Sequence, residues 1–276
     1  MKTTFKSTLV ENQGTQFLND ESTIREWLDK YGIKGYSING DMTVSLDGSL
    51  SLDDKGLEEI PVKFSEIAGS IDVTTNKLKR IDWAPAKVNG DFDAWDNEIE
   101  TLMGGPTEVE HSMDVDGNKL TDLHGAPKKV GKCFVVSQNP LKTLAGCPQT
   151  VGGYFKAADC KLPHIDDLPR EIGTNLYIQG NEITSLKGIN KLLKTLNTTN
   201  SAKGGNINIS NNPLTSGLTS CLAVKGFKAF VLDKIAPAGN KDLGQAVVII
   251  NKAVADGEDP FEVQEKVLDS AFADLA

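Results

Sequence analysis

An asparagine recurs every 21 residues through the middle of this chain, interrupted once by a cysteine: Asn76, Asn97, Asn118, Asn139, Cys160 and Asn181. Seven units of this length fill residues 49–195 without a gap. A fixed period of about 20–29 residues is typical of solenoids, in which every unit forms one coil that stacks on its neighbours. The period therefore predicts a rod of stacked coils.

Five apolar columns run through the seven units, at positions two, four, nine, twelve and nineteen when each unit is counted from its first residue. In the unit that begins at Ser70 they are Ile71, Val73, Leu78, Ile81 and Val88. Alternation at positions two and four is typical of a short strand with one buried face. No coil could bury these side chains by itself, so the units must stack.

Position seven carries the asparagines, with Lys55 in the first unit and Asn212 in one further unit. The chain turns after each strand and leaves buried backbone groups that need hydrogen-bond partners. A side-chain amide can donate and accept across neighbouring coils, whereas a cysteine thiol is a weaker substitute. We interpret this column as a structural ladder, in which loss of one amide costs about 1–3 kcal/mol.

A proline stands at position sixteen in five successive units: Pro85, Pro106, Pro127, Pro148 and Pro169. Because proline lacks an N–H and fixes φ, this column excludes a helix on the return path and favours an extended, polyproline-like chain. The expected fold class is an α/β-type, right-handed solenoid. It has short parallel strands on a concave face, an extended convex side and helical caps at both ends.

The period and its asparagine and proline columns resemble the short bacterial type of leucine-rich repeat, known from secreted effectors of enteric pathogens, with units of about 20–22 residues. The resemblance covers residues 49–218. It implies a surface that holds a protein partner. Those effectors often add a large catalytic ligase domain, but the 58 residues after Leu218 (276 minus 218) are too few for one. We therefore expect a protein that is not an enzyme.

The repeat divides the chain into an N-terminal tail and cap (1–48), the solenoid (49–218) and a C-terminal cap (219–276). Polar residues 196–205 are expected to form an insertion, after which the pattern returns once.

Both ends of the solenoid are expected to carry caps. At the N-terminal end the sequence predicts a helix and a pair of strands, over Asn19–Tyr31, Tyr36–Ile38 and Met42–Val44. At the C-terminal end it predicts two helices, over Lys241–Ala255 and Asp259–Leu275. The alternative for the last helix is a docking element for another partner.

Charge and apolar content exclude several classes of function. A net charge of −9 argues against nucleic-acid binding, which requires a basic face. No run of 18 apolar residues occurs, and the N-terminus lacks the apolar segment of a Sec signal, so we expect no membrane association. The four cysteines show no paired spacing and indicate reduced thiols. The three histidines fall at unrelated repeat positions, so we expect no metal, no cofactor and no catalytic residue.

Acidic and aromatic side chains divide the outward face of the expected sheet into two halves. Acids at positions one, three and five occupy the first four units, and tyrosines lie in later units. We predict a partner-binding face formed by Asp72, Asp93, Trp95, Asp114, Asp116, Tyr154 and Tyr177. Exposed Trp and Tyr dominate binding hot spots, and carboxylates steer a basic protein partner. The alternative is an ordinary solvated face kept acidic for solubility.

The start of the chain carries Lys2 and Lys6 among threonines and reaches Leu9-Val10-Glu11. This resembles the short capsid-targeting leaders of large contractile-tailed bacteriophages, which are cleaved after Leu/Ile-x-Glu. The resemblance implies a phage-encoded protein of the host cytoplasm, or a virion structural or head-packaged protein cut after Glu11. The alternative is a tail without a leader function.

Overall fold

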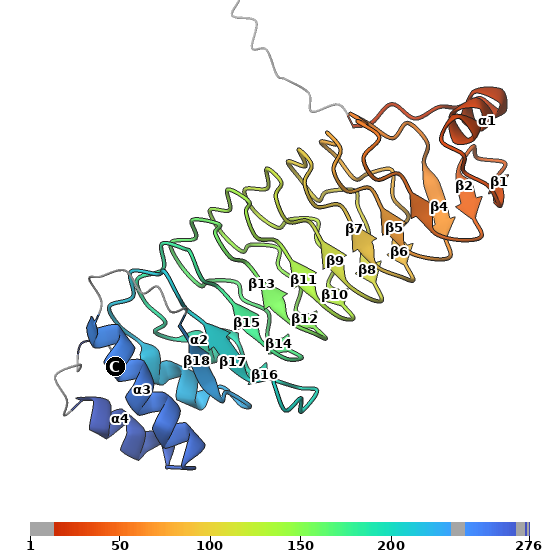
Figure 1. The fold of residues 1–276 in the computed structure, drawn as a ribbon. Coiled ribbons are helices and arrows are strands. Elements are labelled where there is room, and N and C mark those ends of the chain that lie inside the picture. Colours follow the sequence, from red (N-terminus) through yellow and green to blue (C-terminus); the bar gives the residue numbers. More distant parts are fainter. Residues whose placement is uncertain (1–13, 233–240, 269–273, 275) are drawn as a thin grey trace, which may run out of the picture.

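The chain forms one elongated solenoid in the computed structural model, which describes residues 14–232, 241–268, 274 and 276. Figure 1 shows the coils stacked along one axis, with α1 (Glu21–Lys30) at one end and α3 (Lys241–Ala255) with α4 (Pro260–Leu268) at the other. The predicted fold class, a solenoid of parallel-strand coils spaced 21 residues apart, is confirmed. The candidate leader that ends at Glu11 lies outside the described residues.

A nine-stranded parallel ladder runs along the rod. In the seven regular units each strand takes positions two and three, and paired residues lie one unit apart, as Phe92 with Met113. The strands are β3 (Leu50–Ser51), β5 (Ile71–Asp72), β7 (Phe92–Asp93), β9 (Met113–Asp114), β11 (Phe134–Val135), β13 (Phe155–Lys156), β15 (Leu176–Tyr177), β17 (Asn206–Asn208) and β18 (Ala229–Val231). The sequence predicted eight coils; β18 adds a ninth from the region assigned to the C-terminal cap.

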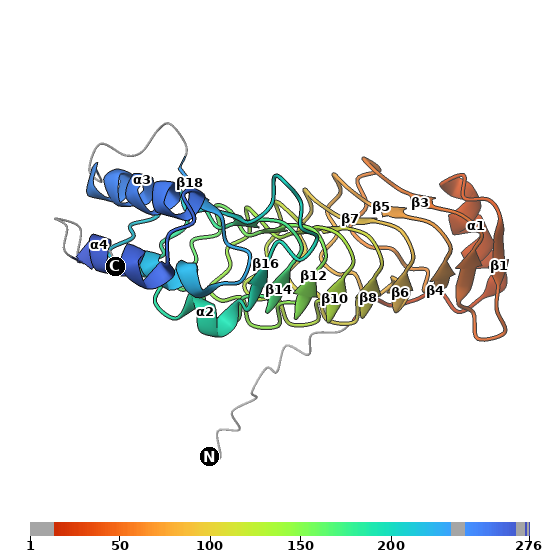
Figure 2. The same cartoon turned by 90° about the horizontal axis from the view of Figure 1, so that it is seen from below.

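A second parallel ladder of six strands was not predicted. Its strands are β6 (Lys87–Val88), β8 (Glu108–Val109), β10 (Lys129–Val130), β12 (Thr150–Val151), β14 (Glu171–Ile172) and β16 (Thr195–Leu196). Figure 2 shows them as a row beneath the coils. After each of β6, β8, β10, β12 and β14 a three-residue bend leads to the next strand of the nine-stranded ladder, as between Val88 and Phe92. Leu196 was expected to begin the insertion, but it is fully buried in β16.

The five apolar columns form one continuous core. Every side chain at positions two, four, nine, twelve and nineteen of the seven units is buried. Aromatic rings stack between neighbouring coils, with 5.8 Å between the ring centroids of Phe134 and Phe155. Each coil therefore contributes one slice of a core that only stacking completes.

Helix α1 covers the N-terminal end of this core. Its first turn is capped by Asp20, whose side chain accepts a hydrogen bond from the N–H of Thr23. Ile24 and Leu28, one turn apart, are fully buried on the inner face of the helix. The helix ends at Lys30, one residue before the predicted end.

A small sheet lies next to α1. β1 (Tyr36–Ile38) pairs antiparallel with β2 (Val44–Leu46), and β2 pairs parallel with β4 (Phe64–Ile67). The first strand has the predicted bounds. The second begins two residues later than the predicted Met42–Val44, because Met42 has a left-handed φ of 64° in the turn.

Proline determines the path that each coil takes on its return. The five units with proline at position sixteen have no helix on the return, as the sequence predicted. A turn precedes each proline, as where the N–H of Ala84 donates to the oxygen of Ile81 at 3.1 Å, and extended chain follows it. The seventh unit has Asn190 at that position, and helix α2 (Ile189–Leu192) forms there. Asparagine supplies the N–H that proline lacks and has no ring to clash with the preceding turn. The conformation of the return therefore changes between the coil that contains Pro169 and the next coil, which contains α2.

The C-terminal end of the nine-stranded ladder is closed by a side chain. Asn251 on α3 donates from Nδ2 to the carbonyl oxygen of Phe230 and accepts the Phe230 N–H at Oδ1, both at 2.8 Å. One amide thus takes the place of the next strand at an edge that would otherwise be open. Helix α3 has its predicted bounds, and α4 packs on α3 and on the 3₁₀ helix η1 (Leu218–Ala223). The predicted extension of α4 to Leu275 enters residues outside the described part.

Candidate protein-binding face

The asparagine column hydrogen-bonds each coil to the one before it. Oδ1 of Asn118 accepts the N–H of Ile99 at 2.9 Å, and its Nδ2 donates to the oxygen of Ala94 at 3.0 Å, both in the preceding coil. The same Nδ2 donates to the oxygen of Val115 in its own coil at 3.0 Å. Corresponding bonds are made by Asn76, Asn97, Asn139, Asn181 and Asn212.

Cys160 replaces the amide in one coil, and the neighbouring backbone adjusts. Its Sγ donates to the oxygens of Val136 and Ala158 at 3.3 and 3.2 Å. The N–H of Leu141, which would meet an asparagine Oδ1 here, donates instead to the oxygen of Asn139 at 2.8 Å. Burial raises the pKa of the Cys160 thiol to about 12, so the thiol stays neutral.

The outward side chains at position three form a column of three carboxylates in direct register. Asp72 pairs with Asp93, and Asp93 pairs with Asp114, across β5, β7 and β9. Within the described residues no ion pair joins any of them to a cation. The next cation in the column is Lys156, beyond Val135. Like charges directly opposed on neighbouring strands destabilise a sheet by about 0.2–1 kcal/mol per pair, so the repulsion within this column opposes stability. Asp72 and Asp114 also accept backbone hydrogen bonds, from the N–H groups of Thr74 and Asp116, whereas no such bond to Asp93 is seen among the described residues.

Trp95 and Asp116, at position five, lie beside this column. Trp95 is 43 % exposed, and Asp116 is half-buried. A depression of about 360 Å³ opens here, lined by Trp95, Asp96, Asp114, Asp116, Gly117 and Gln138. Oδ1 of Asp116 is inaccessible and has no hydrogen-bond partner among the described residues. We call Asp72, Asp93, Trp95, Asp114 and Asp116 the acidic strand face.

Three residues of this depression were not predicted, namely Asp96, Gly117 and Gln138. They occupy position six, where every unit adopts a left-handed φ, here 55°, 64° and 54°. This turn buries the following amide and leaves the side chain at position six on the rim of the face. The signal in the sequence is their place directly before the ladder asparagine.

The two predicted tyrosines form a separate group farther along the ladder. The rings of Tyr154 and Tyr177 lie edge to face with centroids 5.6 Å apart, and Nδ2 of Asn175 donates to the Tyr177 hydroxyl at 3.3 Å. Neither tyrosine lines the depression beside Trp95. Five of the seven predicted residues thus lie together in the acidic strand face, and the two tyrosines lie farther along the same ladder.

Asp93, Asp114 and Asp116 of the acidic strand face have raised pKa values. Burial, followed by the charges of Asp91, Asp114 and Asp72, raises the pKa of Asp93 to about 6. Burial is also the main cause that raises the pKa values of Asp114 and Asp116. A cation placed against this face would relieve the repulsion and lower these pKa values.

This electrostatic strain predicts a specific pH dependence. The pKa of Asp93 is about 6 in the folded state, whereas that of an unfolded aspartate is near 3.9. As the pH falls through 6, Asp93 is therefore protonated in the folded state before it is in the unfolded state, and the free energy of unfolding rises. Asp93→Asn should therefore raise the melting temperature at about pH 7.5, and its advantage over the wild type should shrink towards about pH 5.

A carboxylate two coils earlier provides the control for this melting experiment. The hydroxyl of Ser51 donates to Asp53 and lowers the pKa of that carboxyl. Its stabilising contribution is present above the unfolded pKa and lost in acid, so Asp53→Asn should not raise the melting temperature at about pH 7.5. A lower melting temperature for Asp93→Asn at that pH would show that its charge is not under strain.

The stacked parallel coils, the apolar columns and the asparagine bonds between coils together define the architecture. The fold is a solenoid of stacked parallel-strand coils. Among solved structures, the leucine-rich repeat domain of a Shigella effector is similar, with 22 % sequence identity, a TM-score of 0.48 and coverage of 61 % of this chain and 70 % of that one. No family model and no curated protein matches the sequence.

Two features are absent from the described part of the solenoid. No cluster of three or more His, Cys, Asp or Glu side chains in residues 14–232 and 241–268 is arranged to hold a metal ion. Of the helices in these ranges, none combines the length and apolar character needed to cross a membrane. The acidic strand face and its depression are therefore the strongest candidate site on the nine-stranded ladder.

Proposed function

We propose that this protein is a non-enzymatic interaction module that binds a basic segment of a protein partner on the acidic strand face. The observation that carries the proposal is the column of Asp72, Asp93 and Asp114, stacked without a counter-charge beside an exposed tryptophan. Such a column costs stability in the free protein. A partner that supplies positive charge would offset that cost on binding.

The depression beside Trp95 fits a lysine or arginine side chain. Its lining combines an exposed indole with the carboxylates of Asp114 and Asp116. A cation is attracted to the face of a tryptophan, and carboxylates pair with ammonium or guanidinium groups. The partner's charged end would then meet the half-buried carboxylate of Asp116, which forms no ion pair within the described residues. Tyr154 and Tyr177 would extend the contact along the ladder.

Binding of a labelled lysine- and arginine-rich peptide, followed by fluorescence anisotropy, tests this proposal. Asp93→Asn combined with Asp114→Asn should weaken binding about tenfold at low salt, and high salt should weaken binding to the wild type. Trp95→Ala should also weaken binding about tenfold, with a smaller dependence on salt, because it removes contact area and not charge.

The matched control removes two carboxylates elsewhere on the surface. Glu100 and Glu182 are exposed at positions ten and eight, outside the acidic strand face. Glu100→Gln combined with Glu182→Gln changes the net charge equally and should leave binding nearly unchanged. If both double variants weaken binding to the same extent, the peptide senses only overall charge, and the proposed face is wrong.

A further inference from the structure

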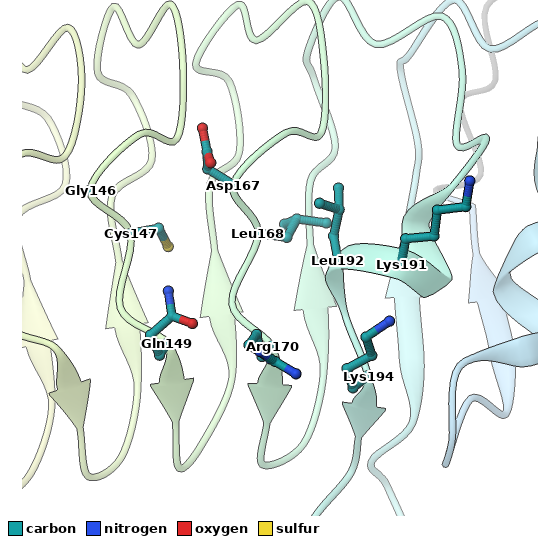
Figure 3. Close-up of a pocket in the computed structure, with 9 residues that line it drawn as sticks. All are labelled: Gly146, Cys147, Gln149, Asp167, Leu168, Arg170, Lys191, Leu192 and Lys194. Carbon is teal, nitrogen blue, oxygen red and sulfur yellow. The ribbon is translucent and has the colours of Figure 1, made fainter.

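A groove of about 530 Å³ lies on the other ladder, where the extended returns give way to helix α2. Figure 3 shows that Cys147, Gln149, Leu168 and Arg170 come from the two preceding coils, and that Lys191 lies on α2. The groove exists because the helical turn takes a different path from the proline-bearing returns beside it. It is therefore a local break in the repeat and not a feature of every coil.

The polar side of the groove is positively charged. Arg170 and Lys194 occupy equivalent places in adjacent coils, since the N–H of Lys194 donates to the oxygen of Arg170 at 2.8 Å. Nζ of Lys194 donates to the Asn190 oxygen at 3.0 Å. Neither these two side chains nor Lys191 forms an ion pair within the described residues.

One acid lines the groove, and it does not neutralise the cations. Figure 3 shows the carboxylate of Asp167 pointing away from Arg170 and Lys194. Elsewhere on the same ladder a comparable cation is paired, as Lys87 with Glu110 at 2.7 Å. Three unpaired cations in one groove are notable in a chain with a net charge of −9.

The inner wall of the groove is apolar. Leu168 and Cys147 are buried there, and Leu192 contributes from α2. Burial raises the pKa of the Cys147 thiol well above its ordinary value, so this wall carries no charge of its own. The groove thus offers cations along one side and aliphatic surface along the other.

We propose that this groove binds an acidic peptide segment of a second protein partner. Carboxylates of that segment would pair with Arg170, Lys191 and Lys194, and an apolar side chain would pack on Leu168 and Leu192. A free phosphate would match the cations but leave the apolar wall uncovered, so the combination favours a peptide. The site is separate from the acidic strand face, and its ligand has the opposite charge.

Anisotropy of a labelled peptide in which glutamate alternates with leucine tests this proposal on the full-length chain. Arg170→Ala combined with Lys194→Ala should weaken binding about tenfold or more. The control is Lys128→Ala combined with Lys142→Ala. Both lysines are exposed and outside the groove, and Lys128 occupies the same repeat position as Arg170. The control should bind like the wild type.

Three results would overturn the proposal: no binding to the wild type at low salt, equal weakening by both double variants, or displacement of the peptide by inorganic phosphate at low millimolar concentration with constant ionic strength. The same peptide with glutamine in place of glutamate should not bind. Binding of the basic peptide to the acidic strand face should be unchanged in Arg170→Ala/Lys194→Ala. The two peptides thus test the groove and the acidic strand face separately, so either proposal can be wrong without the other.

Discussion

Asn118→Ala is expected to lower the free energy of unfolding by about 1–3 kcal/mol, the cost of leaving a buried polar group unpaired. The oxygens of Ala94 and Val115, to which the amide donates, each retain a bond from a neighbouring ladder asparagine, Asn97 or Asn139. The N–H of Ile99 loses the acceptor it has in the ladder. The expected loss of stability therefore comes mainly from the buried N–H of Ile99.

Urea denaturation followed by far-UV circular dichroism measures this change. The midpoint should fall while the slope stays constant, which marks a change of stability and not of the surface exposed. Lys119→Ala provides the control, because this exposed neighbour makes only a surface ion pair with Glu98, worth about 0–1 kcal/mol. If the two variants have the same midpoint, the amide does not hold neighbouring coils together.

Gly173→Ala is expected to be at least as damaging, although it adds only one methyl group. Gly131, Gly152 and Gly173 stand at position twenty of successive units, in the bend between the two ladders. A Cβ at Gly173 would overlap the carbonyl oxygen of Gly152. Backbone atoms of a stacked coil cannot move aside as a side chain can, so we expect a loss of about 1–3 kcal/mol from overpacking.

The same substitution elsewhere should have the opposite sign. Gly244 lies inside α3, and a Cβ added there meets no atom of the described residues within 4 Å apart from the backbone of its own helix. Because alanine is the better helix former, Gly244→Ala should stabilise the protein by about 0.5–1 kcal/mol. Urea midpoints of the two variants check the pair. A neutral Gly173→Ala would mean that the coils stack less closely at this bend than the structure shows.

The nine-stranded ladder could be predicted because its residues repeat with two periods at once. The apolar alternation at positions two and four places strands within a unit, and the 21-residue period places each strand beside the next. The six-stranded ladder carries no such alternation. In its strands only one residue, such as Val88, is buried, and that pattern does not distinguish a strand from an extended loop.

Two other elements that the sequence did not predict, β18 and α2, lie where the repeat is broken. Strand β18 follows a coil of different length, so its residues fall outside the period although Phe230 pairs with Ile207 in register. Helix α2 could have been predicted from Asn190, since the proline column stops there. The groove beside α2 depends on the contact between a helical return and a proline-bearing return, and no single repeat position in the sequence predicts that contact.

The candidate site divides in a similar way. Strand alternation is sufficient to predict that Asp72, Asp93 and Asp114 share one face. It does not predict that Asp93 is half-buried with a pKa near 6, because burial depends on how closely neighbouring coils approach. The depression beside Trp95 also depends on the left-handed turn at position six, which packing of the asparagine ladder imposes.

The central proposal is that a protein partner binds the acidic strand face. Quantitative affinity capture from the organism that encodes this chain tests it most directly. The wild type, Trp95→Ala, Asp93→Asn/Asp114→Asn and Glu100→Gln/Glu182→Gln serve as parallel baits, each verified by circular dichroism to be folded at the temperature of capture. We expect at least one protein with a basic segment to be captured by the wild type and by the Glu100/Glu182 variant, and lost with both face variants. Equal capture of the same proteins by all four baits would contradict the proposal.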